Sequence, residues 1–202
     1  MKKSILLAIM GLAGGVTPSF GFGYILLDNY LSFGPDVTYG PGSGGIAGTG
    51  LDSSWTAGLY SALGDVRSAI SADPAGYADP ATLGGGLTLG TGPGSTVAFY
   101  TTTGDTPGEF SSLQAFQVND NPFETITVMI VAYNGSSYAT SLDRGHSAAF
   151  TMVTSANTSA VIKKVGDFMP GFSVIGPVPE PSTLVLGGLG LAALMLVRRK
   201  KA

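Results

Sequence analysis

The stretch TITVMIVAY, residues 125–133, is a clear strand signal in this chain. Most of its residues are β-branched or aromatic, which favours an extended strand. Successive side chains of a strand point to opposite faces, and one face here is apolar throughout: Ile126, Val128, Ile130 and Ala132. The opposite face begins with threonines but continues with Met129 and Val131. The middle of this strand is therefore expected to be buried on both faces.

Shorter stretches of similar character lie on both sides of this strand. They occupy residues 24–33, 95–103, 113–118, 147–154 and 172–175. Turn signals separate them, among them YGPGSGG (39–45), TGPGS (91–95), NDNPF (119–123) and YNGSS (133–137). Short strands with frequent turns predict an all-β fold, an antiparallel β-sandwich of the jelly-roll or immunoglobulin-like kind, over residues 22–176. Residues 65–83 are Ala-rich but contain two prolines, so we expect an irregular surface excursion there.

Charge is distributed unevenly along the 202 residues. Six of the ten basic residues lie at the two ends of the chain. Between residues 22 and 181, four basic residues stand against all 13 acidic ones, which gives a formal charge of −9. Such a surface repels phosphate backbones, so nucleic-acid binding is not expected.

The chain contains no cysteine. This composition excludes disulfides, a thiol nucleophile, Cys-ligated zinc and an iron–sulfur cluster. An exported domain of this composition must be stabilised by its core or by bound ions. No cofactor is predicted.

Residues 1–21 have the layout of a secretory signal peptide. Lys2 and Lys3 precede an apolar run over residues 5–13, and Ser19 and Gly21 are small enough to permit cleavage before Phe22. The alternative is an uncleaved N-terminal anchor, for which the apolar run is short.

The C-terminal end carries a second apolar segment, residues 182–197. As a helix it would cover about 24 Å, less than the ~30 Å hydrocarbon core, so it is predicted as a marginal single transmembrane helix. A basic cluster follows it and is expected to stay cytoplasmic: Arg198, Arg199, Lys200 and Lys201. Together the two ends place residues 22–181 outside the inner membrane.

A short motif precedes this apolar segment. It consists of Val178, Pro179, Glu180 and Pro181, followed directly by Ser182 and Thr183. The prolines cannot lie in a helix interior, so the motif is expected to be extended and accessible just outside the bilayer.

Residues 177–202 closely resemble the PEP-CTERM sorting signal, also known as the "ice-binding protein C-terminal" motif. The resemblance rests on the triplet, the Gly- and Leu-rich segment and the basic end, in that order. It implies recognition by an exosortase, a transpeptidase-like membrane enzyme, and removal of the tail at or near the triplet. It also implies delivery to the envelope or extracellular matrix of an exopolysaccharide-producing Gram-negative bacterium. The alternative is a plain stop-transfer helix with a coincidental triplet.

No catalytic or metal-binding constellation is predicted. The single histidine, His146, has Asp143 nearby and many serines to choose from, but the nucleophile elbow G-x-S-x-G is absent. We therefore expect His146 to be a turn or surface residue. Glu109, Asp120 and Glu124 are not distinguished from ordinary loop acids, and residues 119–121 do not form an EF-hand loop.

Three aromatic residues have two interpretations. Trp55, Tyr60 and Tyr133 could stack on sugar rings, although core packing is the commoner fate of such side chains.

The favoured hypothesis is accordingly a non-enzymatic structural or adhesive protein of the cell surface or matrix. Its expected partners are the exosortase and, transiently, the inner membrane. The alternatives are a module that binds exopolysaccharide and, third, a hydrolase that uses His146.

Overall fold

The computed structural model describes residues 21–100, 107–156 and 161–177. These residues form ten strands and three 3₁₀ turns. The strands are β1 (Gly23–Asp28), β2 (Val37–Tyr39), β3 (Thr56–Leu63), β4 (Thr88–Leu89), β5 (Thr96–Ala98), β6 (Ser111–Asn119), β7 (Thr125–Tyr133), β8 (Arg144–His146), β9 (Phe150–Val153) and β10 (Phe172–Val174). The turns are η1 (Arg67–Ala69), η2 (Pro80–Thr82) and η3 (Val165–Asp167). The prediction of an all-β fold with antiparallel sheets is confirmed.

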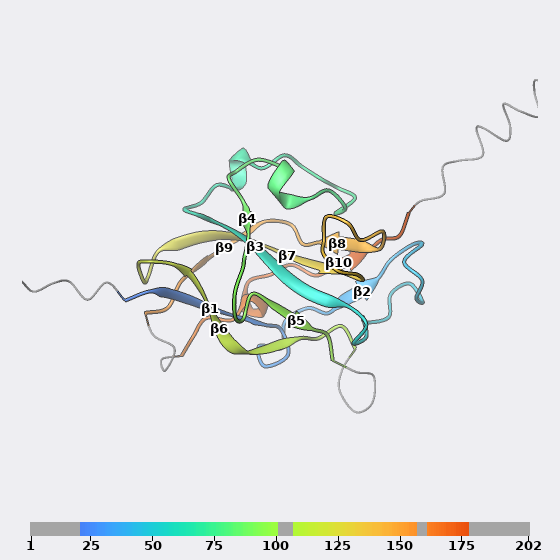
Figure 1. Cartoon of the computed structure of the whole chain (residues 1–202), viewed down its shortest axis with the longest axis horizontal. Coiled ribbons are helices and arrows are strands. Elements are labelled where there is room, and N and C mark those ends of the chain that lie inside the picture. Colours follow the sequence, from blue (N-terminus) through green and yellow to red (C-terminus); the bar gives the residue numbers. More distant parts are fainter. Residues whose placement is uncertain (1–20, 101–106, 157–160, 178–202) are drawn as a thin grey trace, which may run out of the picture.

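The strand predicted over residues 125–133 is β7, and it lies in the middle of the largest sheet (Figure 1). It pairs antiparallel with β3 along its whole length, from Thr56 opposite Tyr133 to Leu63 opposite Ile126. The far edge of β3 carries β4 and β5, and the far edge of β7 carries β8 and β9. Eight of the nine residues of β7 are buried, so the two-sided burial expected from Met129 and Val131 is confirmed.

The main core lies between this sheet and a two-stranded antiparallel ribbon formed by β1 and β6. Ile126, Val128 and Ile130 pack in one cluster with Ile25 and Leu27 of β1. Isolated bridges join the ribbon to the sheet at both sides, Tyr24 to Ser155 and Phe99 to Phe110. Strands thus surround the core on both sides, which accounts for a stable fold without disulfides.

The outer face of the sheet is covered by residues 65–83, which Figure 1 shows above β3 and β7. This segment contains η1 and η2 and no strand, as expected for the irregular excursion. Beneath it a second apolar cluster contains Tyr60, Leu83, Met129, Val131 and Tyr138. The excursion is therefore part of the packed structure and buries the second face of β7.

A second ribbon, formed by β2 and β10, is parallel, with Val37 opposite Phe172. It departs from the predicted antiparallel arrangement. The described strands thus form one six-stranded sheet and two two-stranded ribbons, in place of the two large sheets of a jelly-roll or immunoglobulin-like sandwich.

Several predicted strands are shorter than the sequence pattern indicated, and of the described residues in the stretch 95–103 only β5 is a strand. The stretch 24–33 ends as a strand at Asp28, because the Asp28 Oδ1 atom accepts a hydrogen bond from the Leu31 N–H (2.8 Å) and Asn29 O accepts one from Gly34 N–H (2.9 Å). These bonds turn the chain. Within the stretch 147–154 only β9 is a strand. At Ser147 the side-chain hydroxyl, and not a backbone carbonyl, accepts the hydrogen bond from the Ile130 N–H (3.0 Å), so the regular backbone pairing with β7 is interrupted there.

The two predicted targeting segments lie outside the described residues: the signal peptide, apart from Gly21, and the transmembrane helix 182–197. Among residues 21–100, 107–156 and 161–177, no helix is long and apolar enough to cross a membrane. The ends of the described fold, near β1 and after β10, lie on opposite sides of the molecule (Figure 1).

Candidate functional site

A hollow of about 700 Å³ opens between the excursion and the outer face of the sheet. Its walls are largely apolar and include Ile70 of the excursion, Met129 of β7 and Phe172 of β10. Asp73 and His146 supply polar atoms in the same lining. A hollow of this size, with few polar groups among apolar walls, has the dimensions of a small-molecule site.

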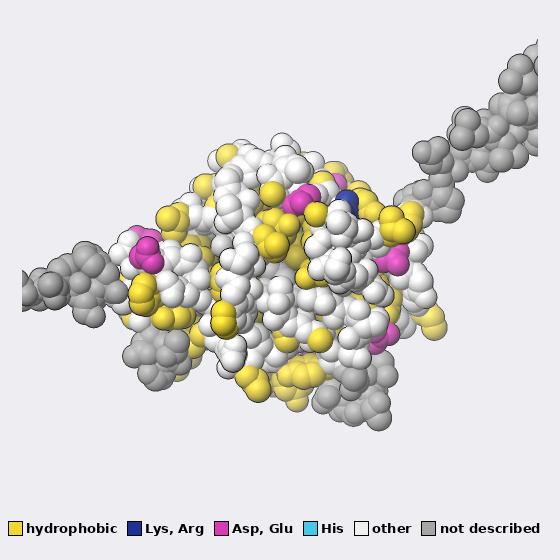
Figure 2. Space-filling model, viewed as in Figure 1, with side chains coloured by type: hydrophobic (Ala, Val, Ile, Leu, Met, Phe, Trp, Pro, Cys, Tyr) yellow, Lys and Arg dark blue, Asp and Glu magenta, His cyan; other side chains and the backbone are white. Residues whose placement is uncertain are grey.

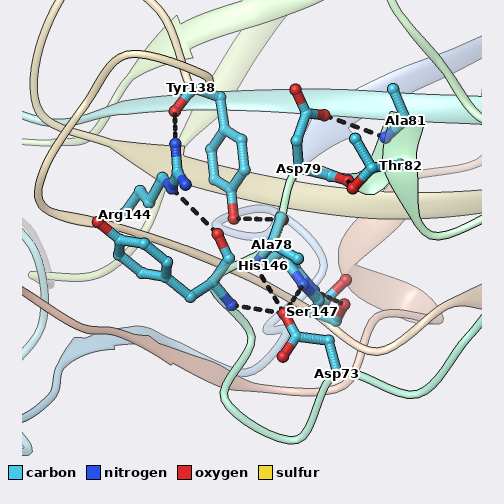
Figure 3. Close-up of polar contacts among 10 residues, drawn as sticks. Asp73, Ala78, Asp79, Ala81, Thr82, Tyr138, Arg144, His146 and Ser147 are labelled. Atoms are coloured by element: carbon cyan, nitrogen blue, oxygen red, sulfur yellow. Dashed lines mark hydrogen bonds and ion pairs between the residues drawn. The ribbon is translucent and has the colours of Figure 1, made fainter.

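Asp73 and His146 form a buried pair at this hollow (Figure 3). The His146 Nε2 atom lies 3.1 Å from Asp73 Oδ2, and the two side chains are only 4% and 15% exposed. The same Asp73 oxygen also accepts hydrogen bonds from the backbone N–H groups of Tyr77 (2.8 Å) and Ala78 (2.7 Å). The pair therefore joins the excursion to β8.

The partners of the His146 ring define its hydrogen-bonding role. His146 Nδ1 lies 2.8 Å from the Ser147 carbonyl oxygen, which can only accept, so Nδ1 carries a proton. Nε2 faces a carboxylate oxygen, which accepts as well when it is ionised. A doubly protonated ring satisfies both acceptors, whereas a neutral ring, with one N–H, satisfies only one of them.

The environment of Asp73 favours its ionised form. Burial by itself would raise the pKa of Asp73, but hydrogen bonds from the Ala78 N–H, from His146 and from the Tyr77 N–H outweigh it and lower this pKa below the ordinary 3.8. A carboxylate with three donors is stabilised by charge-assisted hydrogen bonds. Asp73 is thus a structural anion that anchors residues 77–78.

We expect Asp73→Asn to destabilise the fold in a pH-dependent way. The pKa of Asp73 is lower in the folded state than in the unfolded state. Its contribution to the free energy of unfolding is therefore complete when the pH is above the unfolded-state pKa, and it is lost as the pH falls through the folded-state pKa. Urea denaturation at pH 6 should give the variant a free energy of unfolding about 1–3 kcal/mol lower than that of wild type. This difference between variant and wild type should become smaller as the pH falls below 3.8. The control is Asp65→Asn, at an exposed surface pair with Arg67, where little change is expected. A gap that stays constant with pH would contradict this role of the carboxylate.

Arg144, two residues before His146, holds the neighbouring loops (Figure 3). Its guanidinium donates to the carbonyl oxygens of Tyr77 (3.0 Å), Tyr138 (2.9 Å) and Ala139 (2.7 Å). It also lies over the Tyr77 ring, 4.3 Å from the centroid, and 5.3 Å from that of Tyr138. One cation therefore connects the excursion, the 134–143 loop and β8.

Arg144→Ala is expected to lower the free energy of unfolding by about 1–3 kcal/mol, because three carbonyl groups lose their donor. Arg144→Lys should recover only part of this loss, since an ammonium group does not reproduce the planar fork that spans several acceptors. Full recovery with lysine, measured by thermal unfolding, would show that charge alone is required.

The sequence-based expectation for His146 is wrong. It lies in a buried strand and pairs with Asp73, not with Asp143, so it is neither a turn residue nor a surface residue. Both ring nitrogens already have partners, and neither is directed at a serine hydroxyl. Asp73 lies 73 positions before His146 in the chain. Its local sequence indicates only a turn, through the Asp73-Pro74 pair, and gives no sign of a histidine partner. Arg144 could have been noticed as one of few cations in the body of the chain.

Of the two interpretations of Trp55, Tyr60 and Tyr133, core packing is confirmed and sugar stacking is wrong. All three are buried, and the Trp55 side chain is 1% exposed. Trp55 belongs to the main core, while Tyr60 and Tyr133 belong to the second cluster under the excursion. Their apolar rings are removed from water by packing and offer no platform to a ligand.

Of the acidic residues considered from the sequence, Asp120 and Glu124 lie in the turn between β6 and β7, and Glu109 lies at the opposite end of β6. Glu109 is buried just before β6, whereas Glu124 follows its far end and accepts a hydrogen bond from Asn119 Nδ2 (2.6 Å). Glu109 and Glu124 therefore do not face each other across a cleft. Within the described residues there is no cluster of three His, Asp or Glu side chains able to hold a metal ion.

The described fold continues almost to the predicted sorting residues. Gly176 is buried and donates its N–H to Pro41 O (3.1 Å), and Pro177 is exposed. Val178, Pro179, Glu180 and Pro181 lie outside the described residues, as does the basic cluster 198–201.

Comparison with known protein families matches residues 177–200 to the PEP-CTERM protein-sorting motif. The chain carries a PEP-CTERM sorting signal. The resemblance seen in the sequence is thereby confirmed. Comparison with curated proteins and with solved structures found no match.

The PEP-CTERM motif directs exported proteins to processing by an exosortase. The match covers only the C-terminal segment, so it identifies the processing route of the protein and does not identify the role of the β domain.

Proposed function

We propose that this protein is a non-enzymatic structural or adhesive component of the cell surface or extracellular matrix. The observation that carries the proposal is the PEP-CTERM motif at residues 177–200. In the order of events that we propose, the signal peptide 1–21 is removed, and the segment 182–197 holds the precursor at the inner membrane. The exosortase then acts at residues 178–181, and the β domain is released to the surface.

The surface of the domain supports a role outside the cell. Figure 2 shows a face with few charged side chains, most of it formed by uncharged polar groups and backbone. Large apolar side chains are scattered at exposed positions such as Leu113 and Phe33. His146, the catalytic residue of the hydrolase alternative, has both ring nitrogens hydrogen-bonded, which supports a structural role over a proton-transfer role.

The first test is the location and intact mass of the protein in its native host. We expect the mature form in surface or matrix fractions, beginning near Phe22 and ending near Pro181. Replacing residues 179–181 by alanine should retain the precursor in the membrane fraction with its tail. A wild-type protein found only in the cytoplasm would contradict the proposal.

A second candidate function is binding of a neutral polysaccharide, and the hollow beside Asp73 favours it. The Asp73 carboxylate is already engaged by His146 and by the Tyr77 and Ala78 N–H groups, and Arg67 is paired with Asp65, so the hollow offers no unpartnered charge among these groups to a cation or an anion. Apolar walls with polar edges suit a sugar ring, which presents C–H groups on its faces and hydroxyls at its rim.

Saturation-transfer NMR with neutral and uronate oligosaccharides tests this second function. Ile70→Trp should fill the hollow and abolish binding of a neutral oligosaccharide, while Leu113→Trp, at a 90% exposed position on β6, should leave it unchanged. Binding that survives Ile70→Trp, or that prefers uronates, would contradict a neutral sugar site in this hollow.

A further inference from the structure

Burial and backbone hydrogen bonds fix β10 and the two residues after it in the described fold, as far as Gly176, the residue before the sorting motif. Val174 of β10 is fully buried in the core. Ile175 exchanges two backbone hydrogen bonds with Arg144, at 3.1 and 3.0 Å, and Gly176 N–H donates to Pro41 O. The matched motif begins at residue 177.

Glycines line the slot in which this strand lies. A Cβ atom on Gly40 would approach Val174 O to 2.6 Å, and one on Gly145 would approach Ser173 O to 2.7 Å. A Cβ atom on Gly176 itself would lie 1.9 Å from Gly42 O. Backbone thus packs directly against backbone on both sides of residues 173–176, and only glycine permits this approach.

The seated strand leaves little free chain before the triplet. Only Pro177 and Val178 separate Gly176 from Pro179, a span of at most about 11 Å when fully extended. Enzymes and other proteins that recognise a peptide commonly bind it as an extended segment of several residues. A domain seated two residues from the triplet therefore competes for space with the enzyme that must bind there.

The pairing of β10 is also of very long range. Its partner β2 lies 135 positions earlier in the chain, as in the Thr38–Ser173 hydroxyl contact (2.8 Å). Contacts of large sequence separation close long loops, and folds that depend on them form slowly. A newly exported chain thus spends an interval with β10 not yet seated.

From this geometry we propose that seating of β10 restricts exosortase access to the sorting motif, so that processing is fastest on chains whose last strand is free. The inference rests on the proposed function, since it requires the exosortase to act at residues 178–181. When only a fraction of chains is competent, the apparent affinity falls by that fraction. The fold therefore acts as a steric gate on its own processing.

Pulse–chase processing of the full-length chain in its native host tests this gate. A Gly-Ser spacer of six residues inserted between Gly176 and Pro177 should speed conversion of precursor to mature protein several-fold. Gly145→Val, which forces β10 out of its slot, should have the same effect. The matched insertion after Gly92, an exposed loop position with open space around it, should leave the rate unchanged.

A second control separates release of β10 from general destabilisation. Gly64→Val strains a left-handed position (φ 78°) at the end of β3, away from β10, and should not speed processing. The gate is overturned if the spacer leaves the rate unchanged or lowers it, or if Gly64→Val speeds processing as much as Gly145→Val. Absence of processing in wild type and in all variants would instead contradict the proposed function.

Discussion

Asn29→Ala is expected to lower the free energy of unfolding by about 3–5 kcal/mol, one of the two largest effects predicted for a single side chain of this fold. Asn29 is fully buried after β1. Its Nδ2 group donates to Pro35 O (3.0 Å) and Gly108 O (3.2 Å), and its Oδ1 atom accepts from the Phe110 N–H (2.6 Å). Alanine removes the partner of the Phe110 N–H and of Pro35 O in the interior, and each of these groups then bears its desolvation penalty, whereas Gly108 O keeps the hydrogen bond from the Val37 N–H (3.0 Å).

Asn29→Asp gives a sharper form of the same experiment. A carboxylate can still accept from the Phe110 N–H but faces the two carbonyl oxygens with no proton to donate. We expect it to destabilise at least as much as alanine at neutral pH, as measured by urea denaturation of the exported protein. The matched control is Asn134→Ala at an exposed turn, expected to stay within about 0.5 kcal/mol of wild type. Equal effects at both positions would contradict the role assigned to Asn29.

Trp55→Ala is expected to cost about 3–5 kcal/mol, the range found for removing a large aromatic side chain from a core. The Trp55 ring is buried in the main cluster and packs edge-on against Tyr39, with centroids 5.6 Å apart. Its Nε1–H donates to the Tyr39 hydroxyl (3.0 Å), which in turn donates to Asp52 Oδ2 (3.1 Å). Alanine removes both the packing and the donor.

Trp55→Phe separates the two contributions, because it keeps an aromatic ring and removes the N–H. We expect it to cost clearly less than alanine, by thermal or urea unfolding followed by circular dichroism. The comparison variant is Tyr24→Ala, at a partly exposed side chain on β1. Because it removes less buried area, it should lower the free energy of unfolding less than Trp55→Ala does. A near-neutral Trp55→Ala variant would mean that the ring is a surface platform, as the sugar-stacking hypothesis required.

Much of the strand content could be predicted from local pattern. Residues 125–133 form β7 with the expected two-sided burial, and the excursion 65–83 is irregular as its prolines indicated. Strand ends were less predictable. The β-branched and aromatic pattern of residues 24–33 continues past Asp28, but side-chain and backbone bonds at Asp28 and Asn29 turn the chain there.

The candidate site was predicted poorly, because its members are far apart in the chain. The distance from Asp73 to His146 is 73 positions, and from Tyr77 to Arg144 it is 67. His146 resembles a surface residue in its local context, since glycine and serine flank it. Its burial follows from the pairing of β8 with β7 and from the excursion that covers it, neither of which a local pattern encodes.

The all-β class, the strand over residues 125–133 and the PEP-CTERM signal could be predicted from local sequence, because each depends on residues adjacent in the chain. Side-chain alternation, turn residues and the sorting motif can all be read within a few positions. The full burial of Trp55, the pairing of His146 with Asp73 and the position of β10 between glycines beside β2 depend on the folded chain and have no local signal. These features require long loops to close and backbones to meet, and their free energy arises only when distant segments pack together.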